Sequence, residues 1–200
     1  MGKFKDAILA GICIGIGSFV NMKIGGFYGA VLFAFGLLVV VKEKYNLFTG
    51  IAGWTTDIKQ LLVSLVGNFV GCGLVGQVGK FCSPFDMSTA AETVISSRIS
   101  IGPIGCFFLA ILCGFIVTVS VKHARNNSYA PLLIGVPVFI LAGFPHCIAD
   151  IYSLTAVSFD YMKEHWIFML AVWSSIIVGN YVGCNLYRIH KEPDTTALLS

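Results

Sequence analysis

Apolar residues gather into six long runs separated by shorter polar stretches, at residues 7–22, 25–41, 61–79, 99–121, 129–151 and 166–187. A helix needs about 20 apolar residues to cross a bilayer, and the first two runs are somewhat shorter than that. The pattern predicts an all-α integral membrane protein with six transmembrane helices. Residues 80–98 are expected to form the longest extramembrane stretch, a loop with one short helix, and residues 188–200 a polar tail.

Two of these apolar regions are interrupted. The sequence Gly-Phe-Pro at 143–145 breaks the fifth run, because proline lacks a backbone N–H and clashes with the preceding helical turn. His146 follows directly, and Asp150 lies four residues later. A second break, at 45–50, contains Thr49. In lipid, irregular backbone is tolerated only where it is buried in protein or lines a cavity, and an ionisable residue there indicates function. We therefore expect two broken helices that face each other along a solute pathway.

A nine-residue sequence occurs twice. Val-Gly-Asn-Tyr-Val-Gly-Cys-Asn-Leu at 178–186 repeats Val-Gly-Asn-Phe-Val-Gly-Cys-Gly-Leu at 66–74, 112 residues earlier, with seven of nine positions identical. This repeat predicts two halves of three helices each, at residues 7–79 and 99–187. Because three is an odd number, the two halves cross the membrane in opposite directions. Inverted repeats with broken helices are typical of transport proteins with a site near the membrane midplane.

Two further pairs of positions have similar separations. Gly11 and Gly114 are 103 residues apart in similar sequence contexts, and the breaks at Thr49 and His146 are 97 apart. We expect Thr49 and His146 to occupy corresponding positions in the two halves.

Composition and charge agree with a membrane protein. The chain is 56% hydrophobic and 12% charged, against about 25% charged residues in soluble proteins. With six spans, nine basic residues lie on the side of the two termini: Lys3, Lys5, Lys42, Lys44, Lys59, Lys122, Arg125, Arg188 and Lys191. Four lie on the other side: Lys23, Lys80, Arg98 and Lys163. The positive-inside rule then places both termini in the cytoplasm of a cell-membrane protein, and the net charge of +3 gives no sign of nucleic-acid binding.

Cysteine and histidine spacing favours neither disulfides nor metal. The seven cysteines form no C-x-x-C pair, and most lie in apolar runs as small packing residues. His123, His165 and His190 have no spacing typical of a zinc site. A membrane enzyme or redox protein using His146 and Cys147 would need a convergent set of acid, base or metal ligands, and the sequence offers none. No cofactor, metal or enzymatic activity is expected.

Several stretches together carry a family resemblance: residues 26–50, with Phe33, Gly36, Leu37 and Asn46-Leu-Phe-Thr-Gly50; Gly67-Asn68; residues 111–114; and Gly143-Phe-x-His-Cys-Ile-Ala149. Here the sequence resembles the formate/nitrite transporter family, from residue 7 to residue 187. The resemblance implies an aquaporin-like protomer in a homopentamer, with one pore per protomer, that moves small monovalent anions such as formate, nitrite or hydrosulfide. It implies that His146 is the central pore histidine, that Thr49 lies on the loop after the second span, and that apolar constrictions are lined by Phe33, Leu37, Phe48 and Phe139.

The sequence departs from the family pattern at several positions. Arg98 stands where lysine is usual, and Asp150 where asparagine is usual. Gly114 replaces an asparagine, and Asn46 and Pro145 each replace an acidic residue. These differences concern substrate choice and gating more than the fold.

The candidate residues have structural as well as functional interpretations. Imidazole titrates near neutral pH, so His146 can give a hydrogen bond or a proton to a weak-acid anion, which would make transport proton-coupled. Alternatively, His146 caps a broken helix and the chain is a channel for a small neutral solute. Thr49 either caps a helix or holds the imidazole. Arg98 is an interfacial anchor or an electrostatic attractor for anions. Asp150 could reach His146 one turn away.

Overall fold

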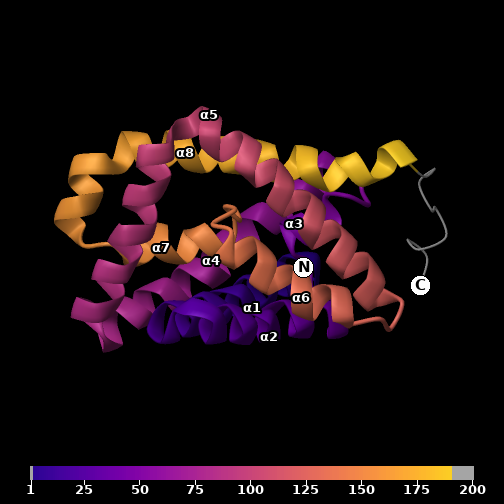
Figure 1. Cartoon of the computed structure of the whole chain (residues 1–200), viewed down its shortest axis with the longest axis horizontal. Helices are drawn as coiled ribbons and strands as arrows, with labels where there is room; N and C mark the ends of the chain where they lie inside the picture. Colours follow the sequence, from indigo (N-terminus) through magenta and orange to yellow (C-terminus); the bar gives the residue numbers. More distant parts are fainter. Residues whose placement is uncertain (1, 191–200) are drawn as a thin grey trace.

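The computed structural model describes residues 2–190, and the part of the predicted tail beyond residue 190 lies outside them. Within this range every regular element is helical, which agrees with the predicted all-α class (Figure 1). The elements are α1 (Gly2–Ile24), α2 (Gly26–Lys42), α3 (Phe48–Ile51), α4 (Ile58–Cys82), α5 (Pro84–Arg125), α6 (Ala130–Leu141), α7 (Ala149–Ala156), α8 (Phe159–Leu186) and a 3₁₀ turn, η1 (Tyr187–His190).

Four of these helices are long and apolar enough to cross a bilayer. They are α1, α4, residues Met87–Arg125 of α5, and α8. The helices α2 and α6 are apolar but shorter. Each therefore spans only part of a hydrocarbon core about 30 Å thick. The chain is a multi-pass membrane protein.

The prediction of a loop at residues 80–98 was wrong. Helix α4 runs to Cys82, and α5 begins at Pro84, where the missing N–H of proline costs nothing because a first-turn N–H has no helical partner. Met87, Ala91 and Ile95 follow at four-residue intervals, and all three are buried. This periodicity identifies one packed helical face, which the polar residues between them obscured.

Helix α5 contains a sharp bend at Gly102, whose φ of 78° and ψ of 167° are not helical. Glycine adopts positive φ without a steric cost, and the following Pro103 disfavours helical geometry at residue 102. In Figure 1 the first part of α5 crosses the molecule, and the second part runs beside α8. Because of this bend, the two parts of α5 run in different directions.

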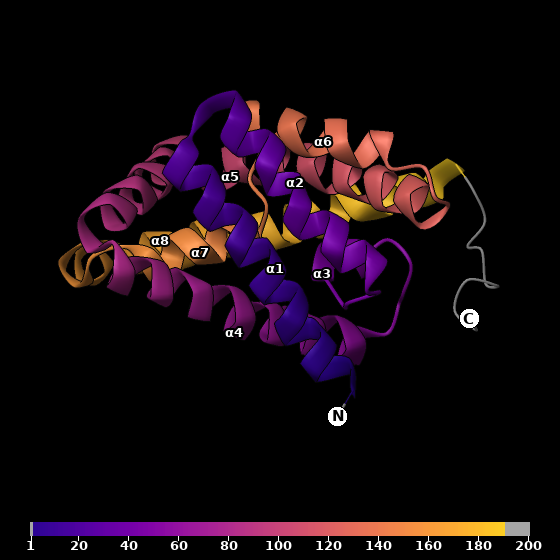
Figure 2. The same cartoon turned by 90° about the horizontal axis from the view of Figure 1, so that it is seen from below.

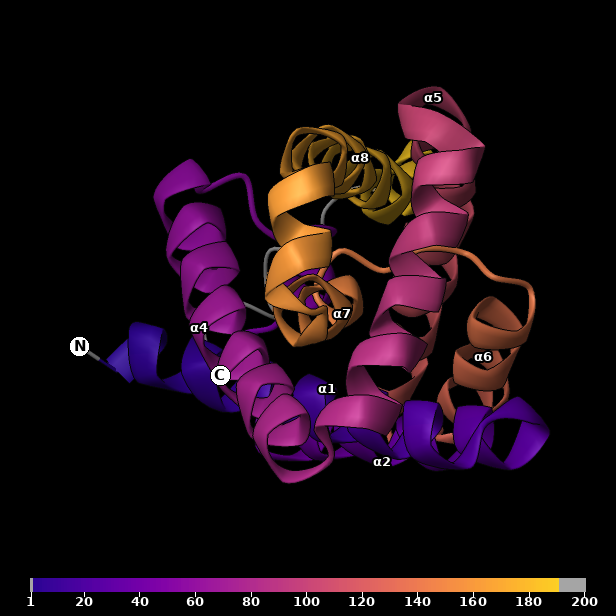
Figure 3. The same ribbon diagram turned by 90° about the vertical axis from the view of Figure 1, so that its left-hand side faces the viewer.

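The long helices pack in two pairs, and each pair also contacts one of the shorter helices α2 and α6. Helix α1 packs against α4 and α2, as Figure 2 shows, while α5 packs against α8 and α6. Helix α7 lies between α4 and α5 (Figure 3). The close approach of α1 to α4 and of α5 to α8 requires Gly11 and Gly114, since a Cβ there would collide with the backbone of Asn68 and of Asn180, respectively.

Candidate functional site

Two non-helical segments meet in the interior. Residues 43–47 separate α2 from α3, and residues 142–148 separate α6 from α7. Thr49 in α3 and His146 in the second segment are both buried. Thr49 Oγ1 lies 3.0 Å from His146 Nε2, so the structure brings together the two residues that the sequence singled out at its breaks.

The hydrogen bonds of His146 define its tautomer. The backbone N–H groups of Ile148 and Ala149 donate to Nδ1 over 3.3 and 3.2 Å. A nitrogen that accepts hydrogen bonds carries no proton, so in the neutral ring the proton is on Nε2. Nε2–H then donates to Thr49 Oγ1, and the Thr49 hydroxyl keeps its own hydrogen for another acceptor. His146 therefore both caps the backbone that enters α7 and holds Thr49.

Aromatic rings surround this pair. The rings of Phe139 and His146 are stacked, with centroids 5.7 Å apart and planes 23° apart. Phe33 meets Phe139 edge to face, with centroids 6.1 Å apart. Leu37 and Phe48 are buried in the same apolar cluster. The four apolar candidate residues thus lie in one buried cluster, and two of them reach the imidazole directly or through one ring.

A cavity of about 280 Å³ lies beside His146. Its wall includes the rings of Phe33 and Phe139, the imidazole of His146, and the charged side chains of Arg98 and Asp150. Five of the eight candidate residues therefore line one hollow, which is large enough for a small solute with some water.

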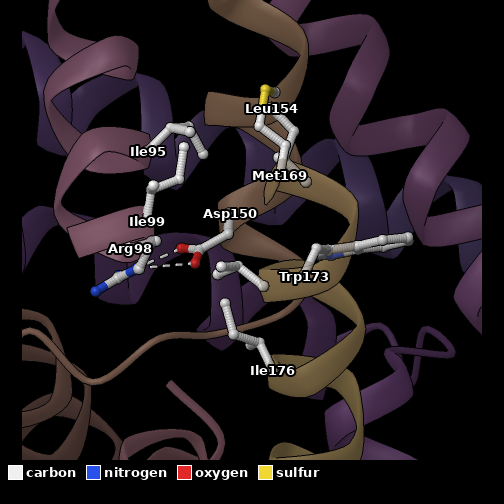
Figure 4. Close-up of a pocket in the computed structure, with 9 residues that line it drawn as sticks. Ile95, Arg98, Ile99, Asp150, Leu154, Met169, Trp173 and Ile176 are labelled. Carbon is white, nitrogen blue, oxygen red and sulfur yellow. Dashed lines mark hydrogen bonds and ion pairs between the residues drawn. The ribbon is translucent and has the colours of Figure 1, made fainter. Parts of the chain in front are cut away.

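Arg98 and Asp150 form a buried ion pair (Figure 4). Arg98 Nε lies 3.0 Å from Asp150 Oδ2, and the two side chains are only 13% and 8% exposed. Arg98 Nη1 also donates to the Gly143 carbonyl over 2.8 Å. The carboxylate of Asp150 thus engages Arg98, whereas its backbone N–H donates to the carbonyl oxygen of His146. Arg98 is neither a free surface charge nor an exposed interfacial anchor.

Asn68 supports the first non-helical segment, a role that the sequence analysis did not assign. Its side-chain oxygen accepts from the N–H of Phe48 over 2.8 Å. Its nitrogen donates to the carbonyls of Ala7 and Asn46 over 2.7 and 2.9 Å. One buried amide thus ties α4 to α1 and to the backbone just before Thr49.

Asn180 supports the second segment in the same way. Its oxygen accepts from the N–H of Cys147 over 2.7 Å. Its nitrogen donates to the carbonyls of Ala110 and Pro145 over 2.8 and 3.1 Å. Both asparagines occupy the third position of the repeated nine-residue sequence, which was the signal that could have identified them.

Two buried thiols cross between the segments. Cys72 Sγ donates to the Ile148 carbonyl over 3.1 Å, and Cys184 Sγ donates to the Thr49 carbonyl over 3.3 Å. Cys72 and Cys184 occupy the same position in the two copies of the nine-residue sequence. The carbonyls to which they donate therefore correspond, which makes Thr49 the counterpart of Ile148 rather than of His146. The expected correspondence of Thr49 with His146 is therefore wrong by two residues, and the two side chains meet across the site from non-equivalent positions.

Among residues 2–190, the cysteines are all free thiols, and no group of three or more histidine, cysteine, aspartate or glutamate side chains is arranged to hold a metal ion. The site is therefore built from hydrogen-bonding, aromatic and ion-paired side chains.

Comparison with known proteins places this geometry in a family. The family model described as "Formate/nitrite transporter" matches residues 2–188. A solved structure described as "Pentameric formate channel with formate bound" is similar with a TM-score of 0.77 and 19% identity, over 93% of this chain and 93% of that one. Another, described as "FNT family ion channel", has a TM-score of 0.78 and 17% identity, over 93% of this chain and 86% of that one. No curated protein matches. The chain belongs to the formate/nitrite transporter family.

Proposed function

We propose that the protein is a channel or transporter for small monovalent anions of the formate, nitrite and hydrosulfide class, and that the solute passes Thr49 and His146. The observation that carries the proposal is the 3.0 Å contact between these side chains, one of which lines the cavity of about 280 Å³. It supplies hydrogen-bonding groups beside the buried rings of Phe33 and Phe139. A small anion that moves from the cavity into the protein interior loses bound water, and these hydrogen-bonding groups can replace it.

The apolar cluster sets the main barrier. A bare anion loses its hydration beside Phe33, Phe139, Leu37 and Phe48, which costs several kcal/mol unless hydrogen bonds replace the lost water. A weak acid avoids most of this cost if it takes up a proton and crosses as a neutral molecule. One proton then travels with each anion, so transport is proton-coupled.

His146 acts in this scheme as a hydrogen-bond donor at the barrier. To give away a proton, the ring would first have to carry two, and a proton on Nδ1 would face the two backbone N–H donors already directed at that atom. The accompanying proton therefore comes from the bulk solution as hydronium, and it is released when the acid dissociates on the other side. His146 fixes the Thr49 hydroxyl through Nε2–H, and that hydroxyl donates its hydrogen to the passing solute.

The architecture that accompanies this function is also proposed. Residues 7–79 and 99–187 form two inverted halves of three spans, each with one broken helix, and both termini are cytoplasmic. The matching bonds of Asn68 with Asn180, and of Cys72 with Cys184, support such a two-fold relation. Assembly as a homopentamer is supported by the description of the similar formate channel.

A channel for a small neutral solute is the second candidate. It is favoured by the pairing of Arg98 with Asp150, which leaves the cavity wall without net charge while His146 is neutral. On this alternative His146 serves only to cap α7 and to hold Thr49.

Flux measurements on purified protein in liposomes separate the two candidates. An inward formate gradient should acidify the lumen together with formate movement, because each anion brings one proton, and glycerol should not equilibrate faster than in protein-free vesicles. Rapid glycerol movement without formate flux would contradict the proposed function and support the neutral-solute channel.

A further inference from the structure

An ion pair of opposite charges lies on the cavity wall. Among the described residues that line the cavity, Arg98 and Asp150 are the charged ones, and their charges are opposite. His146 is in a neutral tautomer, as its hydrogen bonds indicate. The wall therefore has a net charge of zero, although it contains an arginine.

The geometry of the pair keeps the two charges together. Arg98 Nε and Nη2 lie 3.0 and 3.5 Å from the two carboxylate oxygens of Asp150, so both atoms of the carboxylate face the guanidinium. Arg98 Nη1 is held by the Gly143 carbonyl. Figure 4 shows apolar side chains around the pair, among them Ile95, Ile99 and Trp173 from α5 and α8. Neither partner can leave without abandoning a buried opposite charge, which is strongly unfavourable.

Pairing changes what an anion in the cavity experiences. A lone guanidinium attracts an anion with an energy that falls only as the inverse of distance, and a low effective dielectric strengthens that attraction. A guanidinium with a carboxylate at contact presents a dipole, whose field falls more steeply. Anions of strong acids, which cannot become neutral, gain most from a lone positive charge and lose most when it is cancelled.

We propose that Asp150 determines selectivity: it cancels the charge of Arg98, so the cavity does not concentrate permanently charged anions, and weak acids that can cross as neutral molecules are preferred. This inference rests on the proposed function and names the class of solute that the site favours. Arg98 is then a positioning residue, because it joins Gly143 to Asp150 on either side of His146.

The test uses chloride, which stays charged at any working pH, and formate, which does not. The measured quantity is the chloride-to-formate flux ratio in liposomes at low ionic strength. Asp150→Asn leaves a net positive charge and should raise this ratio about threefold to tenfold, as expected for one unit charge at an intermediate effective dielectric. Arg98→Gln should lower the ratio. The double variant Arg98→Gln/Asp150→Asn restores a neutral wall and should return the ratio to that of the unmodified protein.

Asp160→Asn is the matched control. Asp160 is exposed near the start of α8, outside the cavity lining, so its removal changes the same formal charge without changing the wall. Its flux ratio should equal that of the unmodified protein. If Asp150→Asn does not assemble, the double variant and Arg98→Gln provide the same comparison, because loss of Asp150 in the glutamine background must also raise the ratio.

Two results would overturn the inference. One is an unchanged ratio in Asp150→Asn while formate flux persists. The other is an equal loss of both anions in Arg98→Gln and in the double variant, since Arg98 would then bind anions irrespective of Asp150. Absence of formate flux in the unmodified protein would instead contradict the proposed function.

Discussion

The non-helical segments 43–47 and 142–148 are held by matching bonds but carry different chemistry. Helix α4 contributes Asn68 to the first segment and Cys72 to the end of the second. Helix α8 contributes Asn180 to the second segment and Cys184 to the Thr49 carbonyl beyond the first. Each long helix thus bonds to one segment and to the backbone at the end of the other or just beyond it.

The side chains at the two segments are not alike. The second segment contains His146, whose ring lines the cavity, and it is bridged by Arg98 from Gly143 to Asp150. The first segment leads into a four-residue helix with Thr49. The residues just after that helix are held from α8 and η1, where Asn185 donates to the Ala52 carbonyl and Arg188 to the Gly53 carbonyl. The comparison indicates that the repeat supplies a rigid frame, and that function resides in the residues that break its symmetry.

The largest effect is expected at His146. In His146→Asn, the side-chain oxygen can still accept from the N–H groups that now bond to Nδ1, because asparagine caps helix starts well. The shorter side chain cannot reach Thr49 as the ring does, so the Thr49 hydroxyl is no longer held for the solute. We expect a folded protein in which formate flux, and the acidification of the lumen that accompanies it, fall more than in any other variant, measured in liposomes under an inward formate gradient.

Asp160→Asn provides a control for this experiment. Asp160 is exposed and lies outside the cavity lining, so this variant should keep its formate flux and its proton coupling. If His146→Asn carries formate at the same rate as the unmodified protein, His146 is structural and the proposed mechanism is wrong.

The next effect concerns the frame. Asn68→Ala and Asn180→Ala each remove one acceptor and two donated bonds from a fully buried position. Each should lower the free energy of unfolding by about 2–4 kcal/mol, because the backbone groups left behind are buried without partners. Thermal unfolding in detergent measures this loss. A large loss in one variant and none in the other would show that the two segments are not held equivalently.

Much of this frame could be predicted from sequence. Gly-Phe-Pro at 143–145 predicts a helix break, because proline disrupts the helical turn directly before it whatever the rest of the fold. The repeated Val-Gly-Asn motif contains both asparagines, although the sequence analysis assigned them no role. Gly11 and Gly114, which have similar sequence contexts, lie against the backbone of Asn68 and of Asn180, respectively.

The remainder depends on contacts that spacing cannot supply. Asn68 accepts from the N–H of Phe48, and Asn180 accepts from the N–H of Cys147, so these two residues occupy corresponding positions. The sequence alone does not show these contacts, and pairing Thr49 with His146 was therefore wrong by two positions. Arg98 and Asp150 are 52 residues apart and on different helices, and nothing local signals their pairing. The result is that the backbone breaks were predictable, whereas the charge balance of the cavity was not.

A moderate effect is expected at Thr49, on the opposite side of the contact from His146. Thr49→Val preserves the branched shape but removes the hydroxyl that accepts from Nε2–H. The imidazole would lose this partner, and the solute would lose a donor, so formate flux should fall about threefold to tenfold, as for the loss of one hydrogen bond. Assembly on a sizing column should be unchanged. Flux like that of the unmodified protein at every pH would limit Thr49 to a capping role.

The smallest effect is expected at the two thiols. Cys72 donates to the Ile148 carbonyl and Cys184 to the Thr49 carbonyl, but a thiol is a weak donor and its small size also serves packing. Cys72→Ala and Cys184→Ala should each lower the free energy of unfolding by about 1 kcal/mol, with flux changed less than the Thr49 variant. Thermal unfolding in detergent measures the stability of the two variants, and liposome assays measure their flux. Cys82→Ala is the control because Cys82 is exposed.

The serine variants make this last test specific to the crossing bonds. A hydroxyl is a stronger donor than a thiol, so Cys72→Ser and Cys184→Ser should recover part of the stability that the alanine variants lose. Because the two bonds are equivalent in the frame, recovery should occur at both positions. Equal stability of the serine and alanine variants would mean that the thiols contribute by packing alone, and that the asparagines carry the coupling between the segments.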